Sequence, residues 1–576
     1  MKNKFFCVLL AVLLVMSFSL TSCATADYSD VNISPPFTKG VNMLGWFDKG
    51  GLNRDTSQDL NKYDEKDIAC LKSMGVDTIR LICTFDLLSD MPYGSGKIHD
   101  TILEKLDQVC DWAEKYQIYL IICNCYNYVV DSPEHENDYG LLKAQLECVW
   151  SQLSQRYKNR SEYIIYEITN EPSNKDADKW YTIQQDIINL IRSNDTKHSI
   201  VVSNVNWSNI TELTQLKPYE DPNLIYTFHF YEPMIFMHQG GDWIADGDVA
   251  GLEGLPFPYD SKRLPKLTGK TKDSWVQWEI ENKYPAEGTI NHINSRITKV
   301  ASWAKKNKVK VLCGEIGANV WINSQDRFAW INATVAALNS NGIPYCIWGI
   351  DNTDGFLKTE NPSQVFPDDI DYDVLIAYGF NMPDATLVQE MNPFLKQFPQ
   401  TPYLVYDGLC GKGTRGDMNG RLQTSKDDEV HGYCLKASYP AQDMNCKLYL
   451  PDIILSKFAQ FEQSLVISFS AKFTDKNQEF IFILQDSDGG EAALPYEKLY
   501  TIKASDYPLN KWVKIEIPVS NFLNGKGVWS NKEQKYFDIP SEFTWSRFES
   551  IFLNFDDFDN IKKGDIYIDD VVLKMK

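Results

Sequence analysis

Two glutamates each follow an apolar run of the kind that forms a buried strand. Glu171 lies in Asn170-Glu171-Pro172 after residues 163–168, and Glu315 follows residues 309–314. Two carboxyl groups that face each other can cleave an acetal bond, because one protonates the leaving oxygen while the other, ionised, attacks the carbon or steers water. Partial burial and mutual repulsion would separate their pKa values and assign these roles. The fold must therefore place the ends of these two runs close together.

The order of elements between residues 38 and 398 predicts such an edge. Short β-branched runs alternate there with amphipathic helical patterns, and most runs are apolar throughout, as parallel strands covered on both faces are. The expected strands are 40–44, 78–83, 118–124, 163–168, 199–203, 224–230, 309–314 and 343–349. Eight strands, most of them followed by a helix, predict an α/β fold of the (β/α)8 TIM barrel type rather than a doubly wound sheet. Reactive groups in that fold lie at the carboxyl ends of the strands, where Glu171 and Glu315 would meet.

The segment after residue 400 has a different pattern. Five runs alternate apolar and polar residues and are separated by Gly, Asp, Asn and Pro; they cover 465–473, 479–485, 511–519, 548–555 and 565–573. This pattern predicts antiparallel strands in an all-β jelly-roll or β-sandwich domain. We therefore expect a barrel over residues 38–398 and a sandwich over 403–576, joined through the proline-containing stretch 398–402.

The first residues have the features of an export signal. Lys2 and Lys4 precede an apolar run over 5–20 that is short for a membrane span. The run ends in Leu20-Thr21-Ser22-Cys23, which resembles the lipobox of bacterial lipoproteins, where the peptide is cut before the cysteine and its sulfur carries lipid. We expect residues 1–22 to be a lipoprotein signal peptide, Cys23 the lipid attachment site and 23–37 a linker. The protein would then be exported and anchored to the bacterial cell envelope, at the outer membrane or cell surface; an ordinary signal peptide, with secretion, is the alternative.

Six motifs, in order along residues 38–360, resemble those of glycoside hydrolase family 5. They are Gly40-Val-Asn-Met-Leu-Gly-Trp-Phe47, Arg80 in Asp-Thr-Ile-Arg-Leu, Asn170-Glu171-Pro172, Phe228-His229-Phe-Tyr231, Glu315 in Cys-Gly-Glu-Ile-Gly, and Trp348 in Ile-Trp-Gly. The resemblance implies that Glu171 is the acid/base and Glu315 the nucleophile. It implies substrate-binding roles for five more residues, namely Arg80, which steadies the nucleophile, Asn170, which binds the sugar 2-hydroxyl, His229, Tyr231, and Trp348, which forms the floor of the cleaved-sugar subsite.

One motif departs from the family pattern. After the third strand the family usually carries a His or a His pair, and here residues 124–128 read Asn-Cys-Tyr-Asn-Tyr. Tyr126 or Asn127 would then occupy the position of a substrate-binding histidine. A hydroxyl or amide can make a similar hydrogen bond but cannot become cationic near neutral pH. Four tryptophans that follow strands could be sugar platforms or loop core: Trp46, Trp207, Trp243 and Trp321.

The resemblance implies double displacement with retained anomeric configuration. The expected substrates are glucans with internal β-1,4 bonds, either cellulose-like, mixed-linkage or glucomannan chains. Within the same mechanism, an endo-β-1,4-mannanase is the alternative. From a different class, the chain could be a catalytically weakened surface lipoprotein that captures glycan. Neither a metal nor an organic cofactor is expected for this chemistry.

Charge and composition narrow the expected partners. A net charge of −21 argues against nucleic acid and suits a neutral polymer such as plant β-glucan. We expect a monomer that meets the membrane only through its N-terminal lipid anchor. Residues 564–573 resemble the closing strand of galactose-binding-like jelly rolls, a group that includes several carbohydrate-binding modules. Whether this second domain binds glycan or is a spacer is left open by the sequence.

Overall fold

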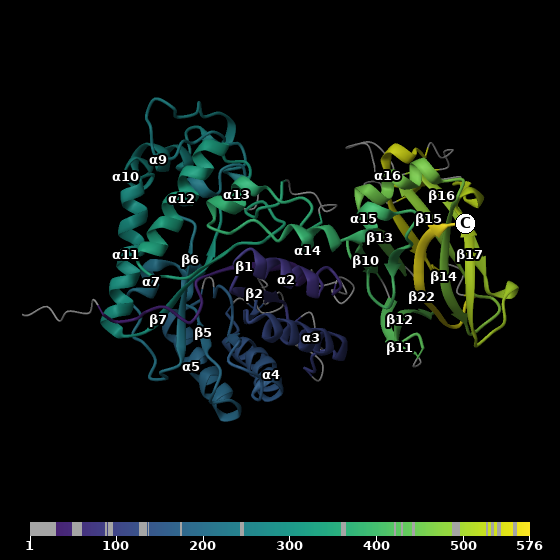
Figure 1. Ribbon diagram of the computed structural model, residues 1–576, viewed down its shortest axis with the longest axis horizontal. Coiled ribbons are helices and arrows are strands. Elements are labelled where there is room, and N and C mark those ends of the chain that lie inside the picture. The colour runs from purple at the N-terminus through teal and green to yellow at the C-terminus, as the bar shows by residue number, and fades with distance from the viewer. Residues whose placement is uncertain are drawn as a thin grey trace, which may run out of the picture.

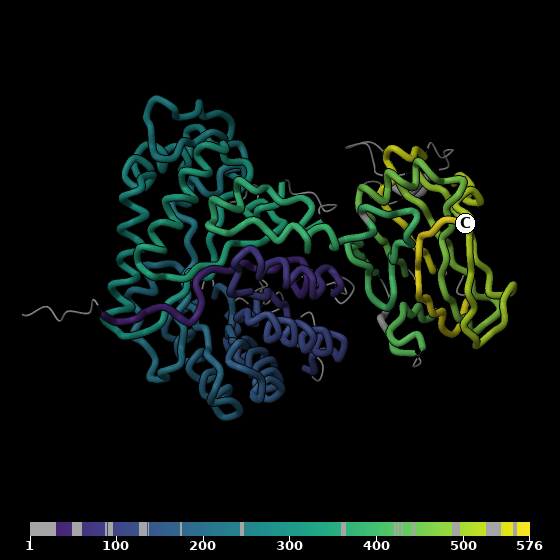
Figure 2. Tube along the Cα trace, in the orientation of Figure 1, coloured from purple at the N-terminus to yellow at the C-terminus, as the bar shows by residue number. Residues whose placement is uncertain are grey.

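The computed structural model contains two folded units that lie side by side along its longest axis (Figures 1 and 2). It describes residues 30–48, 60–86, 89, 96–125, 135, 137–172, 175–241, 247–358, 365–419, 422–427, 430–440, 444–486, 496–525, 528–530, 535–537, 543–556 and 561–576. The proposed signal peptide, Cys23 and residues 24–29 of the proposed linker lie outside these residues. None of the described helices is long and apolar enough to cross a membrane.

The first unit is a closed barrel of eight parallel strands in sequential order, which confirms the predicted TIM barrel. The strands are β1 (Lys39–Phe47), β2 (Thr78–Cys83), β3 (Tyr119–Asn124), β4 (Ile164–Glu167), β5 (Ile200–Val202), β6 (Leu224–Phe230), β7 (Lys310–Ile316) and β8 (Tyr345–Ile347). Each falls on a predicted apolar run. Gly40 allows β1 to approach β2, because a Cβ at that position would lie 2.2 Å from the carbonyl oxygen of Thr78.

The helices that follow the strands begin at residues suited to that place. Asp64 caps α2 by accepting from the amides of Lys66 and Asp67, while the Asp67 carboxylate accepts from the amide of Asp64. Asp138 and Asp176 cap α4 and α5 in the same sense. The helices are α2 (Glu65–Ser73), α3 (Asp100–Tyr116), α4 (Tyr139–Tyr157), α5 (Ala177–Asn194), α6 (Val205–Ser208), α7 (Ile210–Leu213), α8 (Met234–Met237), α9 (Trp275–Asn282), α10 (Tyr284–Glu287), α11 (Ile290–Asn307), α12 (Ser324–Ser340), α13 (Tyr372–Ala377), α14 (Ala385–Glu390) and α15 (Pro393–Gln397).

The interior of the barrel is filled by an apolar layer, as in other barrels of this size. It consists of Phe37, Ile121, Ile165, Val201, Ile225, Leu312 and Cys346. Arg80 is the register neighbour of Ile121, and Asn42 is the register neighbour of Arg80. A fully buried guanidinium therefore borders this apolar layer, which requires that its charge be matched by buried partners. Four cysteines of the strands are buried thiols without a disulfide, as expected for small apolar core residues: Cys83, Cys123, Cys313 and Cys346.

The second unit contains two large antiparallel sheets around one core, as the alternating runs predict, and a separate two-stranded sheet of β19 and β20. One sheet has the order β10-β13-β21-β15-β16-β18; the other has the order β11-β12-β22-β14-β17, with β9 also pairing with β22. The elements are β9 (Tyr403–Tyr406), β10 (Arg415–Asn419), β11 (Leu422–Lys426), β12 (Tyr433–Tyr439), β13 (Asn445–Tyr449), α16 (Asp452–Phe461), β14 (Leu465–Phe473), β15 (Glu479–Asp486), β16 (Glu497–Lys503), β17 (Trp512–Pro518), β18 (Leu523–Asn524), β19 (Val528–Ser530), β20 (Lys535–Phe537), β21 (Phe548–Asn554) and β22 (Gly564–Met575).

The chain passes from one core to the other within a few residues. Met391 belongs to the core of the barrel unit, whereas the Phe394 ring packs on Tyr403 with centroids 5.2 Å apart and Phe398 is buried in the second core. The predicted linker 398–402 therefore begins with a core residue of the second unit. The domain limits at 398 and 403 remain predictions.

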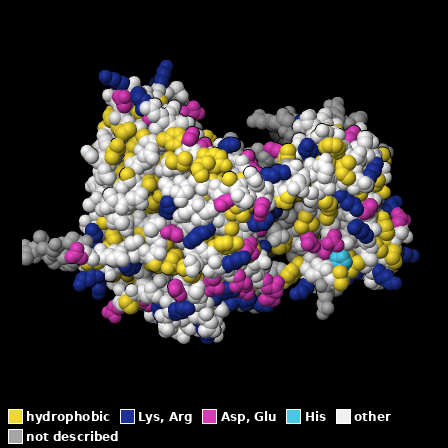
Figure 3. All heavy atoms as spheres, viewed as in Figure 1, with side chains coloured by type: hydrophobic (Ala, Val, Ile, Leu, Met, Phe, Trp, Pro, Cys, Tyr) yellow, Lys and Arg dark blue, Asp and Glu magenta, His cyan; other side chains and the backbone are white. Residues whose placement is uncertain are grey.

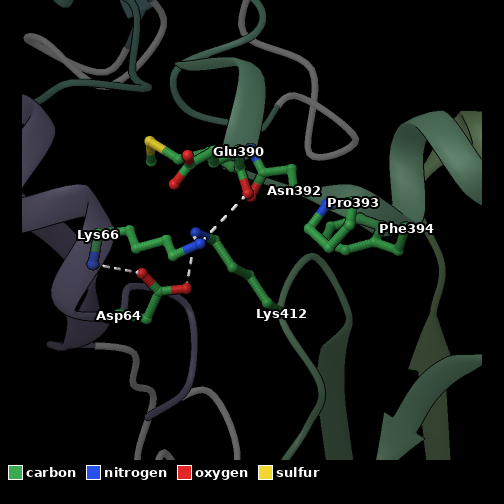
Figure 4. Close-up of a pocket in the computed structure, with 8 residues that line it drawn as sticks. Asp64, Lys66, Glu390, Asn392, Pro393, Phe394 and Lys412 are labelled. Atoms are coloured by element: carbon green, nitrogen blue, oxygen red, sulfur yellow. Dashed lines mark hydrogen bonds and ion pairs between the residues drawn. The ribbon is translucent and has the colours of Figure 1, made fainter. Parts of the chain in front are cut away.

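A lysine of the second unit contacts the first turn of α2. Lys412 Nζ lies 2.7 Å from the Asp67 carboxylate, which is fully buried, and 3.1 Å from that of Asp64. Figure 4 shows Lys412 and Lys66 extending into one pocket from the second unit and from α2, with Glu390 and Phe394 on its other sides.

On the face shown in Figure 3, acidic and basic side chains are interspersed over both units.

Candidate active site

Arg80 on β2 joins the carboxyl ends of four strands inside the barrel. Its Nε and Nη2 donate to the two carboxylate oxygens of Glu167, each at 2.7 Å. Its Nη1 donates to Glu315 Oε1 at 2.9 Å and to Asn42 Oδ1 at 2.8 Å, and its Nη2 also donates to Asn170 Oδ1 at 2.6 Å. One buried cation thus orients groups from β1, β4 and β7 and from the loop after β4.

Glu167 and Asn42 belong to this network although sequence reasoning did not select them. Glu167 is fully buried at the end of β4, and Asn42 Nδ2 donates to the carbonyls of Gly314 and Ile347 at 3.0 and 2.9 Å. A charged residue at the end of a strand that is apolar throughout was the available signal for Glu167, because such a residue is almost never fully buried unless it is paired. Asn42 had a similar signal in β1.

Glu315 lies on β7 with both carboxylate oxygens held. Oε1 accepts from Arg80, and Oε2 accepts from the Tyr231 hydroxyl at 3.0 Å. The Nδ1 of His229 lies 3.4 Å from Oε1. Burial raises the pKa of Glu315 above its usual value, while His229, Arg80 and the Tyr231 hydroxyl counteract that rise. The result is a carboxylate that is held in one orientation by two hydrogen-bond donors.

The Glu171 carboxyl group is more exposed than that of Glu315, and fewer nearby groups offset its negative charge. Its side chain is 23% exposed, and its Oε1 lies 2.5 Å from His229 Nδ1. Burial raises the pKa of Glu171 to about 7, an effect that Arg80 opposes and Glu167 increases. This carboxyl group can therefore hold a proton near neutral pH and release it, as a general acid must. One carboxylate oxygen each of Glu171 and Glu315 lie within 4.8 Å of one another, which is closer than the ~6.5–9.5 Å typical of inverting glycosidases.

His229 on β6 lies between the two glutamates. Burial lowers the pKa of His229 to about 4, so the ring is neutral at working pH. Nε2 has no hydrogen-bond partner among the described residues and faces Gly314. A Cβ on Gly314 would lie 3.1 Å from that nitrogen and 2.6 Å from Thr227 Oγ1. Glycine at position 314 therefore leaves the space that the imidazole occupies.

The structure brings most of the other predicted site residues to the same barrel end. Asn170 is buried, with its backbone amide donating to the backbone carbonyl of Asn124 at 2.9 Å. Trp348 follows β8, is half-buried, and packs with Leu44 on a small cluster that includes Ile82. Tyr126 and Asn127, the expected substitutes for the family histidine, lie outside the described residues.

The tryptophans that were candidate sugar platforms differ in their burial. Trp46 is fully buried, and its Nε1 donates to the Leu60 carbonyl at 2.8 Å, so Trp46 is a core residue. Trp207 and Trp321 are 54% and 42% exposed on the loops after β5 and β7. Trp243 lies outside the described residues.

Three successive residues, Asn206, Trp207 and Ser208, have φ values of +57°, +56° and +53°, a costly left-handed turn for side-chain-bearing residues.

Two groups of described side chains could each hold a divalent cation. Glu171, His229 and Glu315 form one, and His431, Asp569 and Asp570 of the second unit form the other; in each, the donor atoms lie within 4.8 Å of one another. The first group is the carboxyl pair itself. In this group Arg80 and the Tyr231 hydroxyl donate to Glu315, and His229 contacts Glu171.

Comparison with known proteins covers the barrel. The profile of the family described as cellulase (glycosyl hydrolase family 5) matches residues 47–354. Endoglucanase 3 of Fibrobacter succinogenes is 30% identical over 349 residues, which are 56% of this chain and 50% of that protein. Endoglucanase C of Acetivibrio thermocellus is 22% identical over 340 residues, which are 57% of this chain and 95% of that protein. The chain thus spans half the length of the first relative.

Two of the solved structures to which this chain is similar have TM-scores below 0.5. Endoglucanase Cel5A of Thermotoga maritima has a TM-score of 0.48 and 21% identity, covering 59% of this chain and 96% of that one. The cellulose synthase subunit Z of Clostridioides difficile has a TM-score of 0.46 and 21% identity, covering 60% and 99%. Because the family profile covers more than half of the chain and includes Glu171 and Glu315, the chain belongs to glycosyl hydrolase family 5, the cellulase family.

Proposed function

We propose that this protein is a retaining glycoside hydrolase that cleaves internal β-1,4 bonds of glucans. The observation that carries the proposal is the carboxyl pair: the oxygens of Glu171 and Glu315 lie within 4.8 Å at one barrel end, and their environments differ. Glu315 is held as an anion by Arg80 and Tyr231, whereas the pKa of Glu171 is raised to about 7. The relatives named as endoglucanases support a glucan as the polymer.

In the first step, a Glu315 oxygen attacks the anomeric carbon while Glu171 gives its proton to the glycosidic oxygen. The carbon–oxygen bond breaks, the leaving chain departs as an alcohol, and a glycosyl ester of Glu315 forms. Tyr231 and Arg80 hold the attacking carboxylate, and the neutral His229 keeps the Glu171 side chain oriented. One oxygen of each carboxyl group lies within 4.8 Å of the other, which is closer than the separation typical of inverting glycosidases and favours retention.

In the second step, Glu171 acts as a base. Esterification removes the negative charge of Glu315, so the pKa of Glu171 falls once its neighbour is neutral. Glu171 then takes a proton from water, whose oxygen attacks the anomeric carbon and displaces Glu315. The configuration at that carbon is restored and both carboxyl groups return to their starting states.

The test is a hydrolysis screen of wild type beside Glu315→Ala and Glu171→Ala. The panel contains carboxymethylcellulose, barley mixed-linkage glucan, xyloglucan, glucomannan, galactomannan and xylan. Activity on glucans that disappears in both variants supports the proposal. Activity confined to galactomannan and glucomannan would instead assign a mannanase. Binding without release of reducing sugar would assign a glycan-capture protein.

The proposal includes export and lipid anchoring through Cys23, supported by the basic start, the apolar run and the lipobox-like residues 20–23. Incorporation of labelled palmitate into wild type, and its loss in Cys23→Ala, tests the anchor. Accessibility to protease on intact cells then distinguishes the cell surface from the periplasm. A single species of about monomer mass in light scattering, measured after removal of residues 1–23, tests the expected monomer.

A further inference from the structure

The hydroxyl that holds the proposed nucleophile comes from a residue beyond the end of β6. Tyr231 donates to Glu315 Oε2 at 3.0 Å. The pairing of β6 with β7 extends to Phe230 and Ile316, and its pairing with β5 ends earlier, at Tyr226. Because the hydroxyl lies at the end of a long side chain, a small rotation of the backbone at Tyr231 displaces it strongly. The sheet alone therefore does not fix the position of this hydroxyl.

The next residue, Glu232, is held through its side chain by α11. Arg296 donates to both carboxylate oxygens, from Nε to Oε2 at 2.6 Å and from Nη2 to Oε1 at 2.5 Å. His292 lies four residues earlier, on the same face of α11, and its Nε2 is 3.2 Å from Oε2. Arg296 Nη2 also donates to Thr211 Oγ1 of α7 at 3.3 Å. The Glu232 side chain is therefore bonded to α11 and, through Arg296, to α7.

The main chain of Glu232 is held as well. Trp330 Nε1 of α12 donates to the Glu232 carbonyl at 2.8 Å, and Trp330 is fully buried. The same ring stacks on Phe230, with centroids 6.0 Å apart and ring planes 16° from parallel. Tyr231 thus lies between two residues that both contact Trp330, and the second of them is also fixed by the ion pair with Arg296.

This ion pair persists over the pH range in which the nucleophile is an anion. Burial raises the pKa of Glu232, but His292 and Arg296 lower it more, and the net shift is below its usual value. Burial raises the pKa of Glu315 instead. Glu232 is therefore ionised wherever Glu315 is. A bidentate pair of guanidinium and carboxylate restricts geometry as well as adding energy, so it can orient the backbone beside it.

We propose that Glu232 is a positioning residue, which keeps the Tyr231 hydroxyl on Glu315 through its ion pair with Arg296. This inference rests on the proposed glycosidase function, and it gives Glu232 no contact with substrate. A displacement of ~1 Å can cost ~100-fold in rate even when its cause lies away from the reacting atoms. Loss of the Glu232 carboxylate should therefore reproduce part of the effect of losing the hydroxyl.

The specific consequence is a change in the acidity of Glu315. Burial and Glu171 raise its pKa, whereas His229, Arg80 and the Tyr231 hydroxyl lower it. If the hydroxyl moves away, the pKa of Glu315 rises, because one of the groups that lower it is lost. The acidic decline of kcat/KM then moves to higher pH. A residue that only stabilises the fold would leave this decline in place.

The test is a double-mutant cycle of Glu232→Gln with Tyr231→Phe, measured on 2,4-dinitrophenyl β-cellobioside over the acidic pH range. This leaving group needs little protonation, so the acidic decline reports on Glu315. Glu232→Gln alone should lower the plateau of kcat/KM about 10-fold and move the decline to higher pH. In the Tyr231→Phe background, the same change should alter kcat/KM less than about twofold, because the hydroxyl that Glu232 positions is gone.

Asp221→Asn is the matched control. Asp221 lies shortly before β6 as Glu232 lies shortly after it, and Arg192 Nε donates to its carboxylate at 2.6 Å. The side chains of Asp221 and Arg192 are 13% and 17% exposed, so this pair is enclosed like that of Glu232. The kinetics of Asp221→Asn should match the parent protein in both backgrounds. If circular dichroism shows that Glu232→Gln does not fold, Arg296→Lys replaces it, since it keeps the charge and loses the bidentate geometry.

The outcomes separate the inference from a structural role and from the proposed function. A loss confined to proteins that retain Tyr231 supports the inference. An equal loss in both backgrounds, or an unchanged acidic decline in a folded Glu232→Gln protein, overturns it. A Tyr231→Phe protein with the wild-type pH profile also overturns it, because the hydroxyl would then have no effect to position. A wild-type protein that cleaves neither this substrate nor any glucan overturns the proposed function, and the inference with it.

Discussion

Arg80 and Glu167 form a bidentate ion pair, with both N–O distances at 2.7 Å and both side chains inaccessible to solvent, next to the proposed nucleophile Glu315. The same guanidinium also donates to Glu315. Arg80 therefore serves two carboxylates, and Glu167 takes up part of its charge. The arrangement leaves Glu315 anchored but not fully neutralised, as a nucleophile requires.

Replacing Glu167 with Gln should change both stability and the pH profile. Removing one partner of a buried ion pair costs about 3–5 kcal/mol, to be measured by urea unfolding. Because the Glu167 charge raises the pKa of Glu171, its loss should lower that pKa and move the alkaline decline of kcat/KM to lower pH. An unchanged profile in a folded variant would contradict this coupling.

The pH dependence of wild type should follow Glu171. Its pKa of about 7 lies above the ordinary value, and the protonated form is the active acid in the first step. Hence kcat/KM on mixed-linkage glucan should fall about tenfold per pH unit above pH ~7. With 2,4-dinitrophenyl cellobioside, whose leaving group needs little protonation, Glu171→Gln should lose the alkaline decline of the first step. A wild-type profile that stays flat to pH ~9 would remove Glu171 from the acid role.

Tyr231→Phe should weaken the nucleophile without removing it. The hydroxyl donates to Glu315 Oε2 at 3.0 Å and helps to lower the pKa of Glu315. Without it, that pKa rises, so the acidic decline of kcat/KM should move to higher pH and the plateau should fall about 10- to 100-fold. The matched control is Tyr116→Phe, which removes a phenol–carboxylate bond to Glu65 at 2.9 Å on the outer helices; its kinetics should match wild type.

Lys412→Met should loosen the contact between the two units in a pH-dependent way. Burial raises the pKa of Asp67 to about 7, and Lys412 counteracts that rise. A carboxyl group with a raised folded-state pKa contributes stability that is present at low pH and lost as pH rises through that pKa. Without Lys412 the pKa rises further, so the variant should lose little stability at pH 5 and about 2–4 kcal/mol at pH 8.

Urea unfolding of wild type and Lys412→Met at both pH values measures this difference. The control is Lys115→Met, which removes an exposed ion pair with Glu65 on the same helix α2. That pair is solvent-screened, and its loss should change stability little at either pH. Equal losses for Lys412→Met at pH 5 and pH 8 would show that Asp67 does not titrate in this range.

Several features of the fold and site were readable from local patterns. Each of the eight barrel strands falls on a predicted run, because a strand covered on both faces must be apolar along its whole length. Glu171 and Glu315 were found because each follows a strand end, where this fold places its reactive groups. His229 and Tyr231 were found through the resemblance of their motif to that of glycoside hydrolase family 5. The structure adds their mutual contacts, including the 2.5 Å approach of His229 to Glu171.

Other features were not readable from local patterns. Trp46 was a candidate sugar platform, but its burial depends on Tyr63, Phe47 and Leu60, which only the folded chain brings around it. The Lys62–Asp351 ion pair joins residues that are far apart in sequence and close only because β1 and β8 are neighbours in the closed barrel. The docking of Lys412 on α2 has no sequence signal at all.

The sequence by itself determined the alternation of strands and helices, the change to an antiparallel pattern after residue 400, and the two carboxyl groups, since these depend on residue type and spacing along the chain. Only the tertiary structure decided which charged side chains lie next to one another. The shifts in the pKa values of Glu171 and Glu315 depend on burial and on Arg80, Glu167, His229 and Tyr231, which lie on, or directly after, three different strands, β2, β4 and β6. Electrostatic energies depend on distance and solvent exposure in three dimensions, and these quantities arise only when the barrel closes.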